Sequence, residues 1–518
     1  TRTSDMELYP DSIVATTSDF RLEKVMGDVE YADVSVGRAY QYLYPDTNLM
    51  VLKMDEEPFS LYYGSSSLEG SLMISPEGLK GAGNFGFERA LIESGDFSFG
   101  HHSMSADTSD FSLYTDTTFS TLAFLTNDYR TALDFDQRRG TFISTGVSSL
   151  VDIPFNMFIC YMDEIDWDMD GQVMHLRNNI VDEIPDIDAM DRDRLIDLDL
   201  SGSEFISMRP DQDSLRFFST RADYDLQRNI IYAGDVKIIR VADAAVFPGD
   251  GKLTILEDAR IETLSDADIV TDTASRYHHI YDANVNIFSR HAYAASGNID
   301  HVDITGEASP VYLSSISVDS LGRSVAHGII SDTASFMLSP WFSYTGNVYM
   351  ASWQPFLHFD GSFSAVHDCF QGTYNRAVVD TLIDPQNILI PVPDSLRGPG
   401  GELIQSAIMY SLRDENFYPA FIAEKRMDED FPALSAKGLL RYDPAAEKFT
   451  VSGGGAEPSE YLSLHTSNCV LEGVGEVSTA NDPPYVDLDL YGRAAHYIPP
   501  DSTSFELVMG FDFFFDPG

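Results

Sequence analysis

Residues 68–99 read LEGSLMISPEGLKGAGNFGFERALIESGDFSF, and this stretch decides the fold class. Apolar or small side chains recur at every second position, and Pro76-Glu77-Gly78 interrupts the alternation. A period of two is typical of a strand with one buried face, and a Pro/Gly break marks a tight turn. The stretch therefore predicts four short strands with inward rows at Leu68–Ile74, Leu79–Phe87, Ala90–Ser94 and Phe97–Phe99.

The same alternation continues through most of the 518 residues, whereas no stretch of a dozen residues has a helical period. Hydrophobic residues make up 43% of the chain, which is more apolar surface than a disordered chain carries. We therefore expect an all-β protein in which stacked short strands form an elongated β-solenoid or jelly-roll-like body with very little helix.

A hairpin-sized pattern also recurs. Each copy has an apolar-x-aromatic-Asp entry (LDFD, ADYD and LRYD), a polar turn, and an alternating exit that ends in glycine. Asp136, Asp225 and Asp443 close these entries, and Asp begins turns because its carboxylate accepts hydrogen bonds from nearby backbone amides. Repeated hairpins predict layers stacked along an axis, although their spacing is irregular. The three copies are Leu133–Gly146, Ala222–Gly234 and Leu440–Gly453.

Two stretches lack this alternation and resemble connectors. Residues 182–203 are rich in acids, and residues 391–401 (PVPDSLRGPGG) are rich in Pro and Gly. They divide the chain into an N-terminal β region (1–181), an acidic linker (182–203), a central β region (204–390), a Pro/Gly connector (391–401) and a C-terminal β region (402–518).

Charge and cysteine content narrow the class of protein. With 82 acidic and 33 basic residues, the net charge of −49 opposes binding to nucleic acid and to anionic lipid. No apolar run is long enough for a transmembrane helix.

The spacing of the three cysteines is not that of a metal site, and one long-range disulfide between two of them is possible. They are Cys160, Cys369 and Cys469. Because both ends resemble cuts, we expect the sequence to belong to a longer or processed polypeptide.

Two resemblances follow from particular segments. Residues 219–263 resemble the β-ladder repeats of lipopolysaccharide-transport proteins of the LptA/OstA type. More broadly, residues 68–99, 155–170, 238–255 and 461–477 look like large cell-envelope β-repeat proteins of Bacteroidota. That likeness implies export to the periplasm or to the outer-membrane or extracellular face of a Gram-negative envelope. The LptA/OstA pattern is carried by Tyr224, Ile231, Ala233, Asp235 and Val236.

Asp166, Asp168 and Asp170, followed by Gly171, match the opening of a calcium loop. Position 12 of that loop should be Glu and is Arg177, so a low-affinity Ca²⁺ site competes with a simple acidic strand and turn. Four aromatic residues could stack on sugar rings, or could instead fill the seam between β-layers. They are Trp341, Tyr344, Trp353 and Phe356.

No nucleophile elbow or phosphate-binding loop occurs, and we expect no enzyme activity. The leading hypothesis is a non-enzymatic envelope or surface scaffold that contacts other envelope proteins. A second is an LptA/OstA-like groove that conducts lipid, and a third is a carbohydrate-binding or carbohydrate-active β-helix protein. The groove would be lined by Leu72, Ile74, Phe85, Phe87, Ile238 and Ile255.

Overall fold

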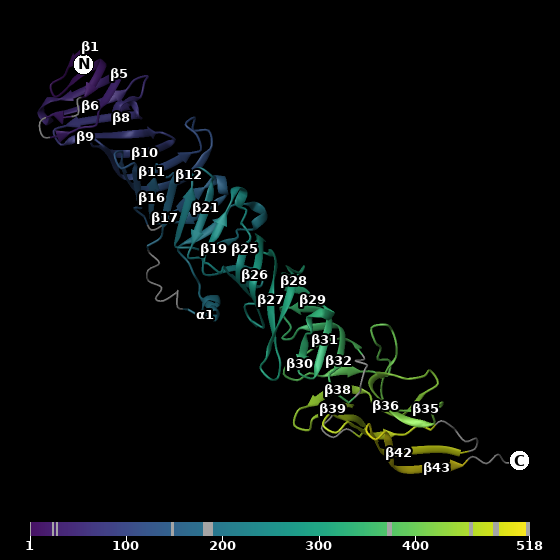
Figure 1. Ribbon diagram of the computed structural model, residues 1–518. Coiled ribbons are helices and arrows are strands. Elements are labelled where there is room, and N and C mark those ends of the chain that lie inside the picture. The colour runs from purple at the N-terminus through teal and green to yellow at the C-terminus, as the bar shows by residue number, and fades with distance from the viewer. Residues whose placement is uncertain are drawn as a thin grey trace. The chain divides into compact units, whose positions relative to one another are not determined.

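A computed structural model of the chain describes residues 2–22, 25–26, 29–146, 150–179, 190–369, 376–454, 459–479 and 486–513. Strands make up 62% of it and helices 5%, and the strand pairs are antiparallel (Figure 1). The prediction of an all-β protein is confirmed.

The chain divides into two compact units. Unit 1 comprises Thr1–Thr273 and Asp282–Ala294, and unit 2 comprises Ala274–Tyr281 and Ala295–Gly518. The division falls in the region of β26 (His278–Ser289) and β27 (Ala292–Val302), and at neither of the two connectors proposed from composition.

Unit 1 contains β1 (Arg2–Leu8), β2 (Ile13–Leu22), β3 (Val25–Met26), β4 (Val29–Glu30), β5 (Val34–Tyr44), β6 (Leu49–Met54), β7 (Phe59–Leu61), β8 (Ser66–Ser75), β9 (Gly78–Phe87), β10 (Ala90–Phe99), β11 (Ser103–Tyr114), β12 (Leu122–Asp134), β13 (Arg139–Ser144), β14 (Leu150–Ile153), β15 (Phe158–Tyr161), β16 (Glu164–Asp168), β17 (Val173–Arg177), β18 (Glu204–Ser207), β19 (Arg216–Phe218), β20 (Arg221–Asp225), β21 (Ile230–Gly234), β22 (Ile239–Val241), β23 (Ala244–Phe247), β24 (Leu253–Ile255) and β25 (Leu264–Thr271). Its helix is α1 (Arg192–Asp197), and its 3₁₀ turns are η1 (Pro45–Thr47), η2 (Tyr62–Gly64), η3 (Pro154–Asn156), η6 (Pro210–Gln212) and η7 (Glu257–Ala259).

Residues 90–99 differ from the prediction of two strands. They form the single strand β10, whose register with β9 shifts between Ser94 and Phe97. The shift lets Ser94 and Phe97 both face inward although they are three residues apart. The strand therefore bends and continues rather than ending in a turn.

Beside this bend, two neighbouring strands carry paired glycines. Gly70 of β8 lies opposite Gly83 of β9, and their φ angles are +151° and +132°. A Cβ on Gly70 would lie 2.1 Å from the carbonyl oxygen of Ala82, and one on Gly83 would lie 2.0 Å from that of Glu69. Only glycine permits this conformation and this close approach of the two backbones.

After β12 the strands of unit 1 separate into two ladders. The C-terminal half of β12 pairs with β13 and its N-terminal half pairs with β14. The first ladder continues as β13–β16–β17–β20–β21–β24, and the second as β14–β15–β18–β19–β22–β23–β25. The chain thus adds a hairpin to one ladder and then a hairpin to the other, and each ladder buries one face.

Four hairpins share one turn. The first strand ends at an Asp, four residues follow, and the last of the four has positive φ: Arg138, Gln172, Asn229 and Glu447. The carboxylate of Asp134, Asp225 or Asp443 accepts hydrogen bonds from the backbone N–H groups two and three residues ahead, at 2.8–3.2 Å. The proposed role of Asp is confirmed, except that Asp134 and not Asp136 begins the first turn.

These turns also stack on one another. Met169 N–H donates to the Arg138 carbonyl at 3.1 Å, and Leu226 N–H donates to the Gln172 carbonyl at 2.9 Å. In each case the first residue after the strand-ending Asp donates to the positive-φ residue of the preceding turn in the same ladder. The layers are therefore joined by one repeated backbone contact, which does not require a constant sequence spacing.

The second ladder is tied to the first through a buried amide. Asn156 of η3 is fully buried, and its Nδ2 donates to the carbonyls of Asn229 at 2.8 Å and Ile255 at 3.4 Å. Both carbonyls belong to the first ladder, in which Asn229 ends the β20–β21 turn and Ile255 ends β24. Asn156 therefore adds a side-chain link between the two ladders, which also share β12.

Replacing Asn156 by Ala is expected to lower the free energy of unfolding of unit 1 by about 2 kcal/mol, because it removes the donor to two carbonyls at a buried site. Urea unfolding followed by circular dichroism measures the change. The Gln227→Ala variant is the control, since Gln227 is exposed in the neighbouring turn. Equal stability of the two variants would contradict the assigned role of Asn156.

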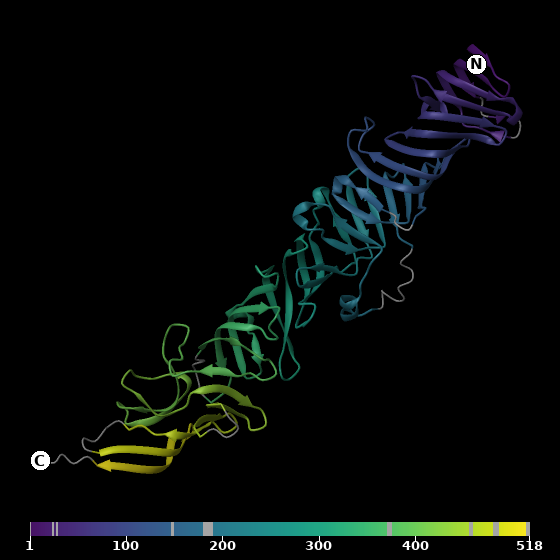
Figure 2. The same ribbon diagram turned by 180° about the vertical axis from the view of Figure 1, so that it is seen from behind.

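The described part of the proposed acidic linker packs against unit 1. Asp191 caps α1 by accepting from Arg194 N–H at 2.9 Å, and Arg240 Nη2 donates to the Leu198 carbonyl at 2.7 Å. Leu195 and Ile196 are buried in one cluster with Ile238 and Phe247. The ribbon of α1 lies at the side of the strands of unit 1 in both views (Figure 1, Figure 2). Residues 182–189 lie outside the described residues.

Unit 2 contains β28 (Ala308–Val318), β29 (Ser324–Ile330), β30 (Met337–Ser339), β31 (Phe342–Ala351), β32 (His358–Ala365), β33 (Ala377–Leu382), β34 (Ile390–Val392), β35 (Ile404–Ser411), β36 (Asn416–Glu424), β37 (Phe431–Ser435), β38 (Gly438–Asp443), β39 (Lys448–Ser452), β40 (Tyr461–His465), β41 (Val470–Glu476), β42 (Val486–Tyr497) and β43 (Ser502–Phe513), with one 3₁₀ turn, η8 (Asp332–Ala334). One ladder runs β28–β29–β31–β32–β33, another runs β34–β38–β39–β40–β41–β42–β43, and β35 pairs with β36 and β37. The proposed connector 391–401 lies within this unit, where Leu396 is buried and its carbonyl accepts from Ile404 N–H.

Candidate functional site

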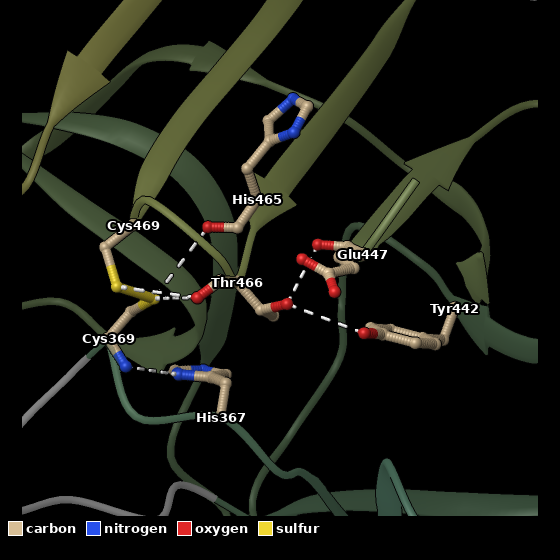
Figure 3. Close-up of a disulfide and its surroundings, with 7 residues drawn as sticks. All are labelled: His367, Cys369, Tyr442, Glu447, His465, Thr466 and Cys469. Carbon is tan, nitrogen blue, oxygen red and sulfur yellow. Dashed lines mark hydrogen bonds between the residues drawn. A yellow bond between two sulfur atoms is a disulfide. The ribbon is translucent and has the colours of Figure 1, made fainter. Parts of the chain in front are cut away.

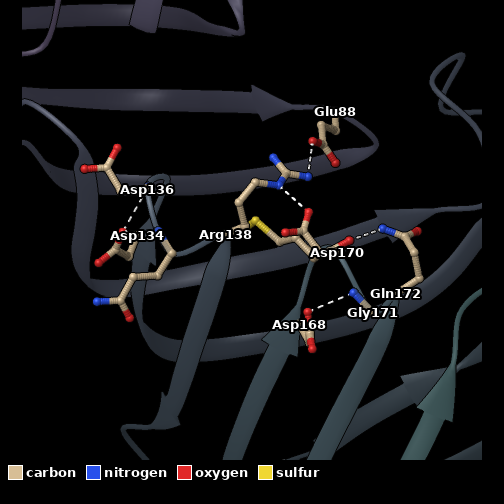
Figure 4. A network of polar contacts seen from close by, with 10 residues as sticks. Glu88, Asp134, Asp136, Arg138, Asp168, Asp170, Gly171 and Gln172 are labelled. Carbon is tan, nitrogen blue, oxygen red and sulfur yellow. Dashed lines mark hydrogen bonds and ion pairs between the residues drawn. The ribbon is translucent and has the colours of Figure 1, made fainter.

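The proposed calcium ligands lie on the β16–β17 hairpin, which uses the shared Asp turn (Figure 4). Asp168 Oδ1 accepts from Gly171 N–H at 2.9 Å, whereas Asp170 pairs with Arg138 Nε at 2.7 Å. Arg138 also donates to Glu88 at 2.8 Å, and the hydrogen bonds to Asp170 and Glu88 raise the pKa of Arg138. Asp166 lies on β16 beside Thr141 and His175. The three carboxylates thus have separate partners.

Among the described residues, no group of three His, Cys, Asp or Glu side chains is arranged as metal ligands. The Ca²⁺ site stays a prediction, and the geometry supports the competing interpretation of a strand and turn. Asp168 accepts a hydrogen bond from the backbone N–H three residues ahead, as Asp134 and Asp225 do in their turns.

Asp168→Ala is expected to cost unit 1 about 1 kcal/mol, whereas Asp168→Asn should cost little, because an amide oxygen can still accept from Gly171 N–H. Thermal unfolding of both variants measures the difference. Titrating Ca²⁺ into the wild-type chain separates the two interpretations. A Ca²⁺-dependent rise in Tm that Asp170→Asn abolishes would show that these acids bind the ion.

The proposed groove residues are mostly packed core. Leu72, Phe85 and Ile255 expose no surface, and the Phe85 ring centroid lies 5.7 Å from that of Phe99. The Phe87 centroid lies 5.1 Å from that of Phe135. A side chain without accessible surface borders no space wide enough for water, and an acyl chain is wider than water.

The other two groove residues fall outside this core. Ile74 is only half-buried, and Ile238 belongs to the separate cluster beneath α1, with Leu195 and Phe247. The six residues therefore do not form one row in the structure.

The four aromatic candidates have different environments. Trp341 stacks on Tyr442 with centroids 4.3 Å apart, and Tyr344 is buried with its hydroxyl donating to the Asn347 carbonyl. Trp353 is 40% exposed and lies under the Arg323 guanidinium at 3.7 Å. Phe356 is half-buried at the wall of a pocket.

Two of the three cysteines form a disulfide, Cys369–Cys469, with Cα atoms 5.2 Å apart (Figure 3). It links the segment after β32 to the β40–β41 turn. Thr466 anchors the β40–β41 turn, because its N–H and its hydroxyl both donate to the Glu447 carbonyl, at 2.9 and 2.8 Å. The open possibility of a long-range pair is thereby settled, while Cys160 is buried as a free thiol.

A pocket beside Phe356 is a candidate site among the described residues of unit 2. Its volume is about 340 Å³, within the ordinary range for small ligands. Four segments line it: 277–281 at the start of β26, 299–302 at the end of β27, 355–357 before β32, and 383–386 after β33. Among these residues only Phe356 and the His278-His279 pair stand out in the sequence, and the rest come together through strand pairing.

Hydrogen bonds hold the walls of this pocket. His278 Nε2 is 2.7 Å from the Gln354 carbonyl, and Ile383 N–H donates to the Leu357 carbonyl at 3.1 Å. Gln386 Nε2 donates to the carbonyls of Val302 at 3.1 Å and Asp303 at 3.0 Å. The four segments are therefore fixed to one another without a ligand.

Two histidines form part of the buried floor. Burial lowers the pKa of both His278 and His301, because an imidazolium there would lose its hydration. His279 is exposed, so the two neighbours point to opposite faces as expected for a strand. His278 and His279 therefore do not chelate one ion in this arrangement.

No helix in the described parts of the chain is long and apolar enough to cross a membrane. Three of the five residues that carry the LptA/OstA resemblance face inward in β20 and β21: Tyr224 and Ile231 expose no surface and Ala233 exposes 1%. Any stacked hairpin needs apolar residues at these positions. Asp235 and Val236 follow β21, and Asp235 pairs with Arg221.

Comparisons with protein-family models, curated proteins and solved structures returned no match, so the candidate site is argued from its own geometry.

Proposed function

We propose that the chain is a non-enzymatic scaffold of the cell envelope or cell surface, built as a β-solenoid-like stack of hairpins. The observation that carries the proposal is the repeated contact between successive turns, Met169 to Arg138 and Leu226 to Gln172. Each turn has a carbonyl that accepts from an N–H of the next turn. A stack joined in this way can be extended layer by layer, because each layer contacts only its neighbours.

The same contact recurs in unit 2. Thr466 N–H donates to the carbonyl of Glu447 at 2.9 Å, and Ile498 N–H donates to that of Cys469 at 3.2 Å. Glu447 and Cys469 both have positive φ, as Arg138 and Gln172 do. One local rule therefore builds layers in both units, which is the property expected of a spacer or scaffold.

An extracytoplasmic location is supported by the Cys369–Cys469 disulfide, because disulfides persist mainly in oxidising compartments. The net charge of −49 also suits a surface that must stay hydrated and apart from anionic lipid.

Mechanical unfolding of the single chain tests the scaffold proposal. Stretched from its ends, a layered stack should lose its strands in successive steps, since neighbouring layers hold each other. Unfolding of each unit in a single all-or-none event would overturn the proposal.

Analysis of co-purified lipid tests the competing lipid groove. The full chain would be expressed with a secretory signal, purified without detergent and examined by native mass spectrometry. Because Leu72, Phe85 and Ile255 leave no space, we expect no bound acyl chain. A stoichiometric acyl lipid would favour transport over a scaffold.

A further inference from the structure

We propose that the pocket of unit 2 between Tyr277, Asp300, Phe356 and Gln386 binds one sugar ring of a neutral glycan. This assignment goes beyond the scaffold proposal and does not depend on it. It rests on the aromatic faces, the hydrogen-bond acceptors and the charge that meet in this one concavity.

Aromatic faces form one part of the pocket. Tyr277 is 51% exposed, and Tyr281 and Phe356 are half-buried. Pro355 and Pro385 add rigid apolar surface beside them. A pyranose has apolar C–H faces and a rim of hydroxyls, so it can cover an aromatic ring with one face while its rim stays hydrogen-bonded. An exposed tyrosine, which has an apolar body and a polar tip, suits such a ligand.

Carboxylate and amide groups form the other part. Asp300 Oδ1 accepts from the Tyr281 hydroxyl at 2.7 Å, and Asp384 Oδ1 accepts from Gln386 N–H at 2.9 Å. An ionised carboxylate has about four lone-pair sites, so each acid keeps capacity to accept from a ligand. Hydroxyls are donors that carboxylates bind through charge-assisted hydrogen bonds. The internal bonds also orient each acid before the ligand arrives.

Charge selects a neutral ligand over an acidic one. The pocket lining contains Asp300 and Asp384 but no Arg or Lys. His278 and His301 are buried, and burial lowers the pKa of both, which disfavours their charged form. A uronic acid or a sulfated or phosphorylated sugar would meet the like charge of Asp300 and Asp384, and the lining has no Arg or Lys to compensate it.

Pre-organisation favours the same conclusion. Hydrogen bonds join His278 to Gln354, Ile383 to Leu357, and Gln386 to Val302. Because these bonds already order the walls, little conformational entropy is lost there when a ligand binds. Tyr277 and Phe356 belong to two of the segments that these hydrogen bonds join.

Isothermal titration of the full chain tests the proposal. The probes are cellohexaose, maltohexaose, mannohexaose and chitohexaose, with oligogalacturonate as the acidic counterpart. We expect at least one neutral hexaose to bind and oligogalacturonate not to bind. No binding by any of the four neutral probes would overturn the assignment, as would equal or tighter binding of oligogalacturonate.

Variants then place the binding in the pocket. Tyr277→Ala and Phe356→Ala should each weaken the neutral hexaose about tenfold or more, since truncating a central aromatic contact commonly costs over 1 kcal/mol. Tyr312→Ala is the matched control, because Tyr312 is 55% exposed on β28 outside the pocket lining.

Asp300→Asn keeps the side-chain size while removing its charge, and it should weaken the neutral sugar and lessen the exclusion of oligogalacturonate. Thermal unfolding of each variant confirms that unit 2 is folded. Unchanged affinity in the folded Tyr277→Ala and Phe356→Ala variants would show that the sugar binds elsewhere and would refute the proposal.

Discussion

Replacing both Cys369 and Cys469 by Ala is expected to lower the free energy of unfolding of unit 2 by about 4 kcal/mol. The pair is separated by 100 residues, and the chain-entropy gain of a cross-link grows with the length of the loop that it closes. Differential scanning calorimetry should show the transition of unit 2 moving down by about 10 °C.

A reductant provides the control for this result. Wild-type protein with the disulfide reduced should unfold like the double variant, whereas the double variant should not respond to reductant. The transition of unit 1 should stay in place, because its cysteine, Cys160, is a free thiol. A double variant with the wild-type Tm would mean that the turns, held by Thr466 and Glu447, suffice to anchor this region.

Placing alanine at Gly70 or Gly83 is expected to destabilise unit 1 by about 3 kcal/mol or more, through backbone strain and overpacking together. Each new Cβ would approach a backbone carbonyl oxygen at 2.0–2.1 Å, and a backbone atom cannot rotate away as a flexible side chain can. β8 and β9 would have to move apart where Gly70 lies opposite Gly83. Chemical unfolding measured by circular dichroism gives the size of the effect.

Gly95→Ala is the matched comparison. Gly95 lies in β10, two residues before Phe97, and a Cβ there would have no atom within 4 Å. This variant should be neutral or slightly stabilising, since alanine reduces the entropy of the unfolded chain. If Gly70→Ala matched Gly95→Ala in stability, the close approach of β8 and β9 would not be a constraint on the fold.

Strand alternation was the most informative signal in the sequence, because it reports a local property. The period of two in residues 68–99 predicts the buried rows, and Leu68, Leu72, Phe85 and Ile92 are indeed fully buried. The Asp turns were recognisable for the same reason, since an aspartate and the amides that it binds lie within three residues. The choice of Asp136 over Asp134 was wrong because Asp134 ends the strand and Asp136 lies two residues later inside the same turn, and only the strand register distinguishes them.

The candidate sugar site could not be assembled in this way. Its walls come from four segments spread over residues 277–386, and none has a pattern of its own. Phe356 stood out as an aromatic residue, yet Trp341 and Tyr344 stood out equally and proved to be packed. Exposure separates these residues, and exposure depends on which distant strand covers each of them.

The sequence by itself determined that the chain is all-β, where many of its buried rows lie, and how its Asp turns close. Each of these follows from interactions within a few residues. Only the tertiary structure decided which ladder each hairpin joins, that Gly70 faces Gly83, that Cys369 meets Cys469, and where a pocket opens. Those outcomes depend on pairing between residues far apart in the chain, and a side-chain period of two is compatible with many such pairings.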